Sequence, residues 1–374
     1  MWTHIVFAPV RPCAHSHFIC GHSSTGPIFN PISTNLICNK VYILNIWVPF
    51  NIRAYQTHFS EGITNKLFGC FQKDNPDDIV MFRIFGEKTE LIIDRNAEKD
   101  TFLKLSKIGC SPPLYCVFKN GMAYGFVKGR PLLLKSVQDE KIYRQVAKEM
   151  VKLHTIDAHI NSTTNQKSFL YTKTENFIEL LPPSFENPAK QERYLKFIPK
   201  RDELIAELAL LRSHLDALNS PVVFCHNDLL LNNIIYDSET DKTGFIDYEY
   251  AFNNFQAFDI GDHFCEFAGV DEVDYNLYPK KEFQLKWLRA YLEYWFEATD
   301  RKPSDVTVTD VERLYVQVNK CALAAHFFWG IWGIIQAKNS NIDFDFLEYA
   351  QLRFDEYFKR KEEFLSLTLP DSLL

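Results

Sequence analysis

The sequence lacks a continuous apolar run of the length that crosses a bilayer. Its longest apolar run, Cys321–Ile335, contains His326 and is shorter than the ~20 residues that a membrane-spanning helix needs. We therefore expect a buried helix there and no stable membrane insertion. The first residues also lack a basic region followed by an apolar core, so no secretory signal is expected.

Cysteine pairs are missing as well. The 9 cysteines are odd in number and dispersed, and they form no CxxC motif. Such a set is typical of reduced, buried thiols rather than of a disulfide framework. We therefore expect a cytoplasmic protein.

Basic residues are not in surplus. The chain carries 41 Lys and Arg against 48 Asp and Glu, which gives a formal net charge of -7. Nucleic-acid-binding proteins carry basic surfaces, so no nucleic-acid partner is expected. The acidic balance agrees with a cationic substrate, although enzymes that act on neutral ligands are equally acidic.

What the sequence does contain is typical of a globular protein. Hydrophobic residues make up 46% and charged residues 24% of the chain. A chain of 374 residues is longer than most single cores allow, so two domains or lobes are predicted. The 32 Phe predict a bulky core with aromatic-lined pockets.

Residues 1–55 differ from the rest of the chain. They are rich in Cys, His, Pro, Ser and Asn and show weak periodicity. Several metal-binding residue types cluster there, namely Cys13, His15, His17, Cys20 and His22. Their spacing matches no ordinary structural zinc site and no second ligand pair follows, so a poorly ordered extension is the favoured prediction.

The next segment, residues 56–128, is predicted to be a small β-rich lobe. The expected elements are strands at Ile63–Phe71 and Asp78–Phe85, a helix at Asp94–Ile108, and a hairpin of Leu114–Phe118 with Met122–Val127. This order of elements is that of a protein-kinase small lobe. Lys128–Pro131 would be the linker that follows it.

Residues 129–374 are predicted to form a large, mainly helical lobe. Helical periodicity covers Asp139–His154, Gln191–Asn219, Lys281–Ala298, Thr309–Ala337 and Asp343–Leu365. Thr309 and Glu312 have the spacing of a capping box at the start of the long helix. The predicted fold class is therefore α+β, a bilobed protein-kinase-like fold.

The stretch 222–261 carries the strongest chemical signal. Asp228 follows an apolar strand, Asn233 lies five residues later, and Asp247 comes after a predicted hairpin. In protein-kinase-type enzymes an Asp, an Asn and a second Asp with this spacing orient the substrate hydroxyl and hold magnesium. Each residue alone is more often a loop or strand-end cap, but the three together favour function. His226 is expected to have a structural role.

Candidates for nucleotide contact lie in the small lobe. The turn Gly62–Lys66 has small and amide residues that let backbone N–H groups approach phosphates, but it lacks a GxGxxG motif, so its signal is weak. Arg83 lies within an apolar strand, where a buried cation needs a partner, and Glu98 could provide it. A solvent-facing Arg on an edge strand is an equally open interpretation.

Candidates for binding a cationic substrate lie near the C-terminus. Trp329 and Trp332 are three residues apart on one helix face, and Tyr349 lies on the following element. Aromatic side chains of this kind can enclose a substituted ammonium, and Glu266 and Asp259 could add negative charge. An ordinary aromatic core is the alternative for the aromatic residues, and a helix cap is the alternative for Asp259.

Five separated segments, in order along the chain, resemble the choline/ethanolamine kinase family. They are GITNKLFGC (62–70), MFRIFGEKTELIIDRNAE (81–98), HNDLLLNNIIY (226–236), FIDYEYAFNNFQAFDIGDHFCEFAG (245–269) and AAHFFWGIWGIIQAK (324–338). The resemblance runs from about residue 57 to 360. The segment EFAGVDEVDYNLYP (266–279) is more similar to ethanolamine kinases than to choline kinases.

The resemblance implies transfer of the ATP γ-phosphate to the hydroxyl of ethanolamine, the first step of the CDP-ethanolamine route to phosphatidylethanolamine, with Mg²⁺. Asp228 would be the catalytic base, and Asn233 and Asp247 the magnesium ligands. The residues implied for the nucleotide are Gly62, Ile63, Thr64, Asn65, Lys66 and Arg83 at the phosphates, and Tyr124–Val127, including Gly125 and Val127, at the adenine. Those implied for the amino alcohol are Glu266, Trp329, Trp332 and Tyr349.

Two positions depart from the family pattern, and other activities stay open. Ser60-Glu61 precede Gly62 where the family often has a second glycine, and Leu230 stands where choline kinases carry Gln. A choline kinase and a phosphotransferase acting on another amine, such as an aminoglycoside, are alternatives. A non-catalytic pseudokinase is less favoured, because all three motif residues are present. Monomer and homodimer both stay open.

Overall fold

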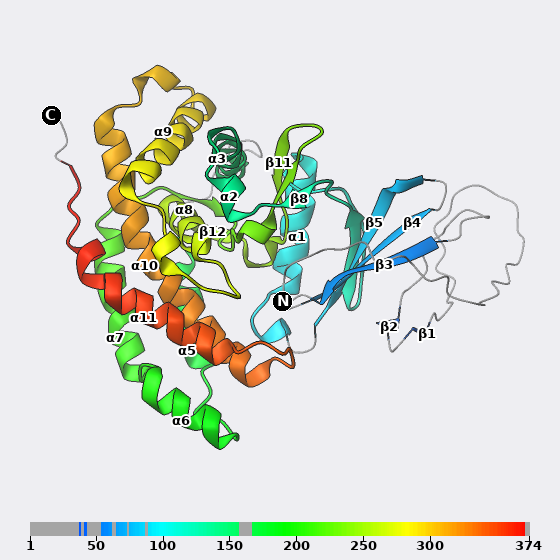
Figure 1. Ribbon diagram of the computed structural model, residues 1–374, viewed down its shortest axis with the longest axis horizontal. Coiled ribbons are helices and arrows are strands. Elements are labelled where there is room, and N and C mark those ends of the chain that lie inside the picture. The colour runs from blue at the N-terminus through cyan, green and yellow to red at the C-terminus, as the bar shows by residue number, and fades with distance from the viewer. Residues whose placement is uncertain are drawn as a thin grey trace, which may run out of the picture. The chain divides into compact units, whose positions relative to one another are not determined.

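The computed structural model describes residues 37–38, 41–42, 54–61, 65–72, 75–86, 89–156 and 167–370 (Figure 1). The chain divides into two compact units. The first comprises Met1–Glu87 and Pro113–Phe126, and the second comprises Lys88–Pro112 and Val127–Leu374. The predicted extension lies almost wholly outside the described residues, and so do the five residues considered for zinc, Cys13, His15, His17, Cys20 and His22. Within it, β1 (Ile37–Cys38) and β2 (Val41–Tyr42) pair antiparallel.

The first unit is built on an antiparallel sheet with strand order β3-β4-β5-β7-β6. The strands are β3 (Ala54–Glu61), β4 (Asn65–Gln72), β5 (Asn75–Phe85), β6 (Leu114–Phe118) and β7 (Gly121–Gly125). Position 121, the first of β7, requires glycine, because a Cβ there would collide with the carbonyl oxygen of Arg83 on β5. The β-rich pattern and the β6–β7 hairpin predicted from the sequence are confirmed.

The second unit is mainly helical (Figure 1). Its helices are α1 (Arg95–Lys107), α2 (Leu134–Val137), α3 (Glu140–His154), α5 (Leu170–Glu179), α6 (Pro188–Phe197), α7 (Arg201–Asp216), α8 (Gln256–Cys265), α9 (Lys281–Ala298), α10 (Val308–Asn339) and α11 (Phe346–Leu365). α10 packs against α8, α9 and α11. It is the one described helix long and apolar enough to span a membrane, but its most apolar window is completely buried within the protein, as expected for a core helix.

Short strands in the second unit bring the motif loops together. β9 (Val222–Cys225) pairs with β12 (Phe252–Phe255), and β10 (Ile234–Asp237) lies between β11 (Lys242–Phe245) and β8 (Arg130–Pro131). The loop after β9 meets the loop after β11, since the Nε2 of His226 lies 2.9 Å from the carbonyl oxygen of Ile246. This arrangement supports His226, Asn227, Asp228 and Asp247.

Helix boundaries follow local sequence signals, with two corrections. The cap of α10 is Thr307, whose hydroxyl accepts the N–H of Asp310 at 3.0 Å, so the predicted Thr309–Glu312 box is wrong by two residues. The predicted helical region Gln191–Asn219 is divided into α6 and α7, because Pro199 between them has no N–H for a helical hydrogen bond.

The helix α1 belongs to the larger unit, whereas the sequence grouped it with the small lobe. Two contacts explain this: Arg95 forms an ion pair with Glu249 at 3.1 Å, and the hydroxyl of Tyr248 donates to the carbonyl of Cys110 at 2.8 Å. The division of the chain at 55 and 128 stays a prediction.

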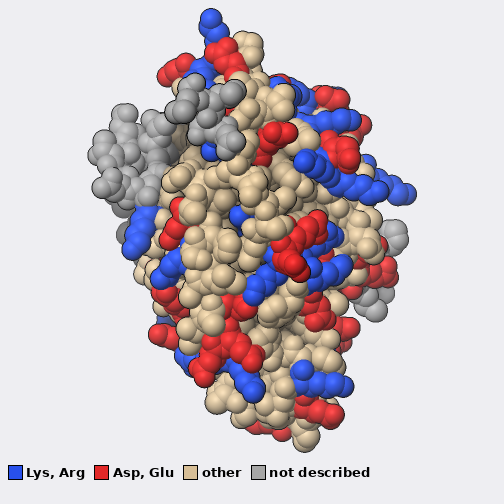
Figure 2. Space-filling view, turned by 90° about the vertical axis from the view of Figure 1, so that its left-hand side faces the viewer, with Lys and Arg blue, Asp and Glu red and all other residues tan. Residues whose placement is uncertain are grey.

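Charged side chains of both signs are interspersed on the face shown in Figure 2. Among the described residues, ion pairs between exposed or half-exposed side chains include Arg193 with Asp345 at 2.7 Å and Arg212 with Glu175 at 2.6 Å. Pairs of this kind contribute little to stability. The face shown therefore has a mixed surface rather than one continuous basic field.

Candidate active site

The loop after β9 is held in an unusual backbone conformation at Asn227. Its φ of 66° lies in the left-handed region, which costs energy for a residue other than glycine. The Asn227 amide compensates by donating to the carbonyls of Tyr250 and Phe252 at 3.0 and 3.2 Å and by accepting from Asn254 at 2.8 Å. These bonds fix the chain immediately before Asp228.

The buried carboxylate of Asp259 fixes the same loop through hydrogen bonds to its backbone. It accepts the backbone N–H of His226 at 2.8 Å and of Asn227 at 2.6 Å, and it also contacts His154 at 3.0 Å. Burial alone would raise the pKa of Asp259, but the contact with His154 and the backbone donors lower it below the usual value. Asp259 lies inside α8, so the alternative that it caps a helix is wrong.

Asp228 and Asn233 lie against each other. The Asn233 amide nitrogen donates to the Asp228 carbonyl at 2.8 Å and to its carboxylate at 3.3 Å. An amide that donates through its nitrogen keeps its oxygen as a ligand. The backbone N–H of Ile246 donates to the carbonyl of Asn233 at 3.0 Å, which brings the next residue, Asp247, beside this pair. Asp247 also has a φ of 66°.

The carboxylates around Asp228 create an excess of negative charge. Burial and the charges of Asp262, Asp247, Glu266 and Glu249 raise the pKa of Asp228 well above its usual value. Burial and the charge of Glu266 likewise raise the pKa of Asp262. A cluster of this kind favours cations, and its hard oxygen donors suit a divalent metal ion as well as an ammonium group.

The predicted aromatic residues lie next to this cluster. The ring centroids of Trp329 and Trp332 are 5.4 Å apart, and that of Tyr349 is 6.0 Å from Trp332. The indole nitrogen of Trp329 donates to Asp262 at 2.9 Å, and that of Trp332 donates to the hydroxyl of Tyr250 at 2.8 Å. The sequence-based expectation that the two Trp share one helix face is confirmed.

Glu266 is paired with a buried cation that the sequence analysis missed. Arg353 donates to Glu266 at 2.5 Å, both side chains are about 2% exposed, and the guanidinium carbon lies 5.0 Å from the ring centre of Tyr349. Asp262 and Tyr250 were also missed. Helical spacing could have identified two of these residues, because Arg353 lies one turn after Tyr349 and Asp262 lies one turn before Glu266.

The small unit holds some of the predicted nucleotide-binding residues. Gly62, Ile63 and Thr64 lie outside the described residues, while Asn65 is buried and Lys66 is exposed at the start of β4. Arg83 is 4% exposed on β5, between β4 and β7, so the edge-strand alternative is wrong.

The remaining predicted nucleotide residues are divided between the two units. Gly125 ends β7, and Val127 begins a segment of the larger unit. Glu98 also belongs to the larger unit, where it accepts from Arg95 at 2.7 Å. Its pairing with Arg83 stays a prediction.

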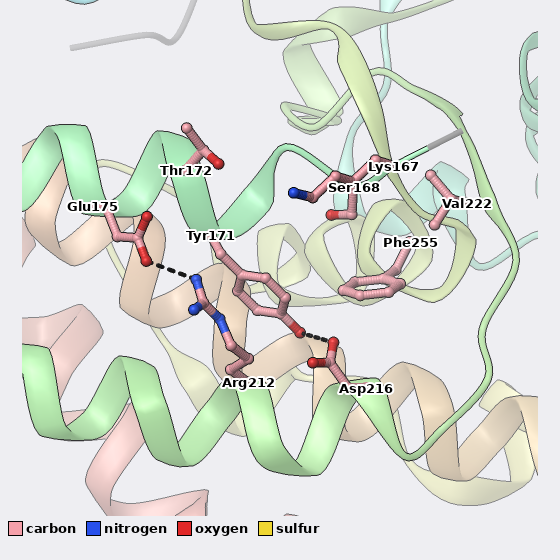
Figure 3. Close-up of a pocket in the computed structure, with 9 residues that line it drawn as sticks. All are labelled: Lys167, Ser168, Tyr171, Thr172, Glu175, Arg212, Asp216, Val222 and Phe255. Atoms are coloured by element: carbon pink, nitrogen blue, oxygen red, sulfur yellow. Dashed lines mark hydrogen bonds and ion pairs between the residues drawn. The ribbon is translucent and has the colours of Figure 1, made fainter. Parts of the chain in front are cut away.

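A surface cavity of about 570 Å³ in the second unit is separate from these residues (Figure 3). None of the predicted site residues lines it. Its polar groups largely pair with one another: Arg212 contacts Glu175 at 2.6 Å, and the hydroxyl of Tyr171 donates to Asp216 at 2.8 Å. The cavity therefore offers no arrangement for phosphoryl transfer.

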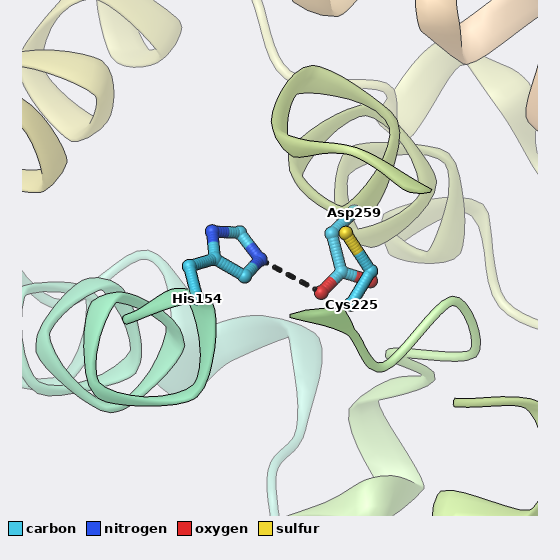
Figure 4. Close-up of side chains that lie close together, drawn as sticks. All are labelled: His154, Cys225 and Asp259. Carbon is cyan, nitrogen blue, oxygen red and sulfur yellow. Dashed lines mark hydrogen bonds and ion pairs between the residues drawn. The ribbon is translucent and has the colours of Figure 1, made fainter. Parts of the chain in front are cut away.

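The donor atoms of His154, Cys225 and Asp259 lie within 4.8 Å of one another (Figure 4). Structural zinc sites use four ligands, whereas here each group already has hydrogen-bond partners. His154 contacts Tyr291 at 2.6 Å, and the Cys225 thiol lies 3.6 Å from the carbonyl of Asn254. We interpret this cluster as a hydrogen-bonded support rather than a metal centre.

Comparison with known proteins agrees with this geometry. The family model described as choline/ethanolamine kinase matches residues 57–358. Ethanolamine kinase 1 of Mus musculus is 47% identical over 313 residues, covering 84% of this chain and 85% of the relative. Ethanolamine kinase 2 of Homo sapiens is 47% identical over 324 residues, covering 87% and 80%.

A solved structure supports the fold. The ethanolamine kinase of Plasmodium vivax is 26% identical, covers 83% of each chain and superposes with a TM-score of 0.71. The predicted α+β, protein-kinase-like fold is therefore confirmed.

Proposed function

This chain belongs to the choline/ethanolamine kinase family, and we propose that it phosphorylates the hydroxyl of ethanolamine with ATP, producing phosphoethanolamine and ADP. The reaction would be the first step of the CDP-ethanolamine route to phosphatidylethanolamine. One observation carries the proposal beyond the comparisons. Asp262 accepts both the indole N–H of Trp329, at 2.9 Å, and the backbone N–H of Leu229, at 3.1 Å, so the aromatic cluster is joined to the residue that follows Asp228.

Asp228 is the proposed catalytic base. The substrate oxygen attacks the γ-phosphorus, the bond from this phosphorus to the β–γ bridging oxygen breaks, ADP leaves, and the hydroxyl proton passes to Asp228. A raised pKa makes the carboxylate a better proton acceptor as long as it remains ionised. Cations bound nearby would favour the ionised form.

Asn233 and Asp247 are the proposed ligands of Mg²⁺. Their amide and carboxylate oxygens are donors that Mg²⁺ accepts together with phosphate oxygens and water, and the Asn233 amide nitrogen is already engaged by Asp228. The ion would neutralise charge on the β- and γ-phosphates. The orientation of the Asn233 amide supports this assignment.

Trp329, Trp332, Tyr349 and Glu266 are proposed to bind the ammonium group of ethanolamine. Aromatic faces attract a cation, and the excess of carboxylates over cations in the cluster favours a positively charged ligand. Positioning the hydroxyl at Asp228 while the ammonium is held at the aromatic residues would align the attacking oxygen, which is the main catalytic contribution in phosphoryl transfer.

The residues proposed for the nucleotide are those identified from the sequence. Gly62, Ile63, Thr64, Asn65, Lys66 and Arg83 would contact the phosphates, Gly125 and Val127 the adenine, and Glu98 would pair with Arg83. The burial of Arg83 at 4% exposure supports a defined role for its guanidinium. The dispersed cysteines support a cytoplasmic location, which we also propose.

A substrate panel tests the function. We expect the purified full chain with Mg²⁺ and ATP to phosphorylate ethanolamine with a higher kcat/KM than choline, and to leave aminoglycosides unmodified. Higher kcat/KM for choline would make the protein a choline kinase. Absence of phosphorylated product with every amine would support a non-catalytic protein and overturn the proposal.

A further inference from the structure

His154 is a buried polar residue at the C-terminal end of α3, outside the motifs that define the reaction. Its side chain is fully buried, its Nε2 lies 3.0 Å from Asp259, and its Nδ1 lies 2.6 Å from the hydroxyl of Tyr291 on α9. Figure 4 shows the imidazole pointing at the Asp259 carboxylate. The side chain therefore joins two helices to the carboxylate beneath the catalytic loop.

Asp259 links His154 to the backbone that precedes Asp228. One of its oxygens accepts the backbone N–H of Asn227 at 2.6 Å, and the other accepts the backbone N–H of His226 at 2.8 Å and contacts His154. The two backbone donors belong to the residues directly before Asp228, and one of them is the left-handed Asn227. A rotation of the carboxylate would therefore move the backbone that places the catalytic base.

The chemistry fixes which ring nitrogen carries the proton. The low pKa of Asp259 keeps its carboxylate ionised, and an ionised carboxylate only accepts hydrogen bonds. Nε2 must then carry the hydrogen that faces it. In a neutral ring Nδ1 accepts, and the Tyr291 hydroxyl donates to it.

We propose that His154 is a positioning residue for phosphoryl transfer, which holds Asp259 through its Nε2–H and thereby fixes the backbone on which Asp228 is mounted. The inference rests on the proposed function. It differs from a simple packing role, because it assigns the effect to one nitrogen of the ring.

Two amide substitutions at His154 distinguish the role of Nε2 from that of Nδ1. The amide nitrogen of His154→Gln can occupy the place of Nε2 and donate to Asp259, whereas that of His154→Asn reaches only the place of Nδ1. Both variants lose the ring and its packing. We expect His154→Gln to keep kcat within about 3-fold and His154→Asn to lower kcat by about 10- to 100-fold, the range expected when a catalytic group is misplaced by ~1 Å, with the KM for ATP and ethanolamine changed little.

A matched control removes packing alone. Val146 lies on the same helix and is completely buried, so Val146→Ala should lower the melting temperature while kcat stays unchanged. Equal kcat values for the Gln and Asn variants, or a loss of kcat in Val146→Ala as large as that in His154→Asn, would overturn the proposal. The wild-type chain in the same assay keeps the two questions apart, since its inactivity would contradict the proposed function itself.

Amide hydrogen exchange gives a readout independent of catalysis. The backbone N–H groups of His226 and Asn227 should exchange at least 10-fold faster in His154→Asn than in His154→Gln, while those of α10 exchange alike. If His154→Asn does not fold, Tyr291→Phe takes its place. It removes only the hydroxyl at Nδ1 and should lower kcat a few-fold and speed exchange at these two amides. A folded Tyr291→Phe with wild-type kcat and exchange would then reject the proposal.

Discussion

Trp329 and Asp262 connect the proposed amine site to the catalytic loop through a 2.9 Å hydrogen bond. The other oxygen of Asp262 accepts the backbone N–H of Leu229 at 3.1 Å, and Leu229 directly follows Asp228. A ligand that packs against the indole ring thus touches a group that is tied to the backbone of the catalytic base. Binding of the amine and placement of the base are therefore expected to depend on each other.

Replacing Trp329 by Phe tests this connection. Phe keeps an aromatic face but loses the N–H, so one oxygen of the buried Asp262 is left without a donor, at a cost of about 1–3 kcal/mol of unfolding free energy. We expect the KM for ethanolamine to rise and kcat to fall, each several-fold, in steady-state assays. Urea unfolding measures the stability change.

Trp287 provides the matched control for this substitution. It is buried, and its indole nitrogen has no hydrogen-bond partner among the residues that the structure describes. Trp287→Phe removes the same ring volume without leaving a buried carboxylate oxygen unpaired. Equal kinetic effects of the two substitutions would mean that the Trp329–Asp262 bond does not link the two sites.

In Asp228→Asn, kcat should fall while the melting temperature rises. Loss of the base is expected to lower kcat by about 10²–10⁴-fold. Because burial and neighbouring carboxylates raise the pKa of Asp228, its ionised form is unfavourable in the folded protein, and a neutral amide should raise the melting temperature in the absence of ligands. Asp343→Asn, at an exposed position, should change neither kcat nor the melting temperature. A variant that kept most of its activity would rule out Asp228 as the base.

The elements were predictable from the sequence because their signals are local. The Asp94 carboxylate caps α1 by accepting the N–H groups of Asn96 and Ala97, and α9 begins at Lys281 and ends at Ala298 as periodicity predicted. The cap of α10 was misplaced because two Thr-x-x-acid patterns overlap there. Only the extended backbone at Thr307 distinguishes them.

The supporting residues were not predictable in the same way. Arg353 pairs with Glu266 across 87 positions of sequence, and His154 contacts Asp259 across 105. A charged residue inside a helix pattern predicts an exposed side chain unless its distant partner is known. The motif residues themselves could be identified because one carboxylate base and two oxygen ligands at fixed spacing imply one chemistry, whereas the residues that orient them carry no such pattern.

Asp247→Asn should weaken the metal site without disturbing the backbone. Asp247 has a φ of 66°, a conformation that Asn tolerates better than most residues, so the substitution changes charge more than shape. We expect the Mg²⁺ concentration for half-maximal activity to rise at least 10-fold at fixed ATP, and EDTA to abolish wild-type activity. An unchanged Mg²⁺ dependence would exclude Asp247 as a ligand.

His263 should make stability depend on pH. It lies in the last turn of α8, and its ring is completely buried, with a contact of 3.3 Å to the carbonyl of Leu229. Burial lowers its pKa from the usual 6.5 to about 4. The folded protein therefore disfavours the charged ring, while the unfolded chain binds a proton below pH 6.5. The stability contributed by the neutral ring is complete above pH 6.5 and is lost as the pH falls toward 4.

The expected loss over this window is about 3 kcal/mol of unfolding free energy, since one pKa unit corresponds to about 1.4 kcal/mol. Urea unfolding at several pH values between 4.5 and 8 measures it. His263→Asn keeps a donor for Leu229 but does not titrate, so its unfolding free energy should fall less steeply with acid than that of the wild type. His226 and His326 are present in both proteins, and their titration therefore cancels in the difference. If the unfolding free energies of the wild type and His263→Asn depend on pH in the same way, the pKa of His263 does not differ between the folded and the unfolded protein.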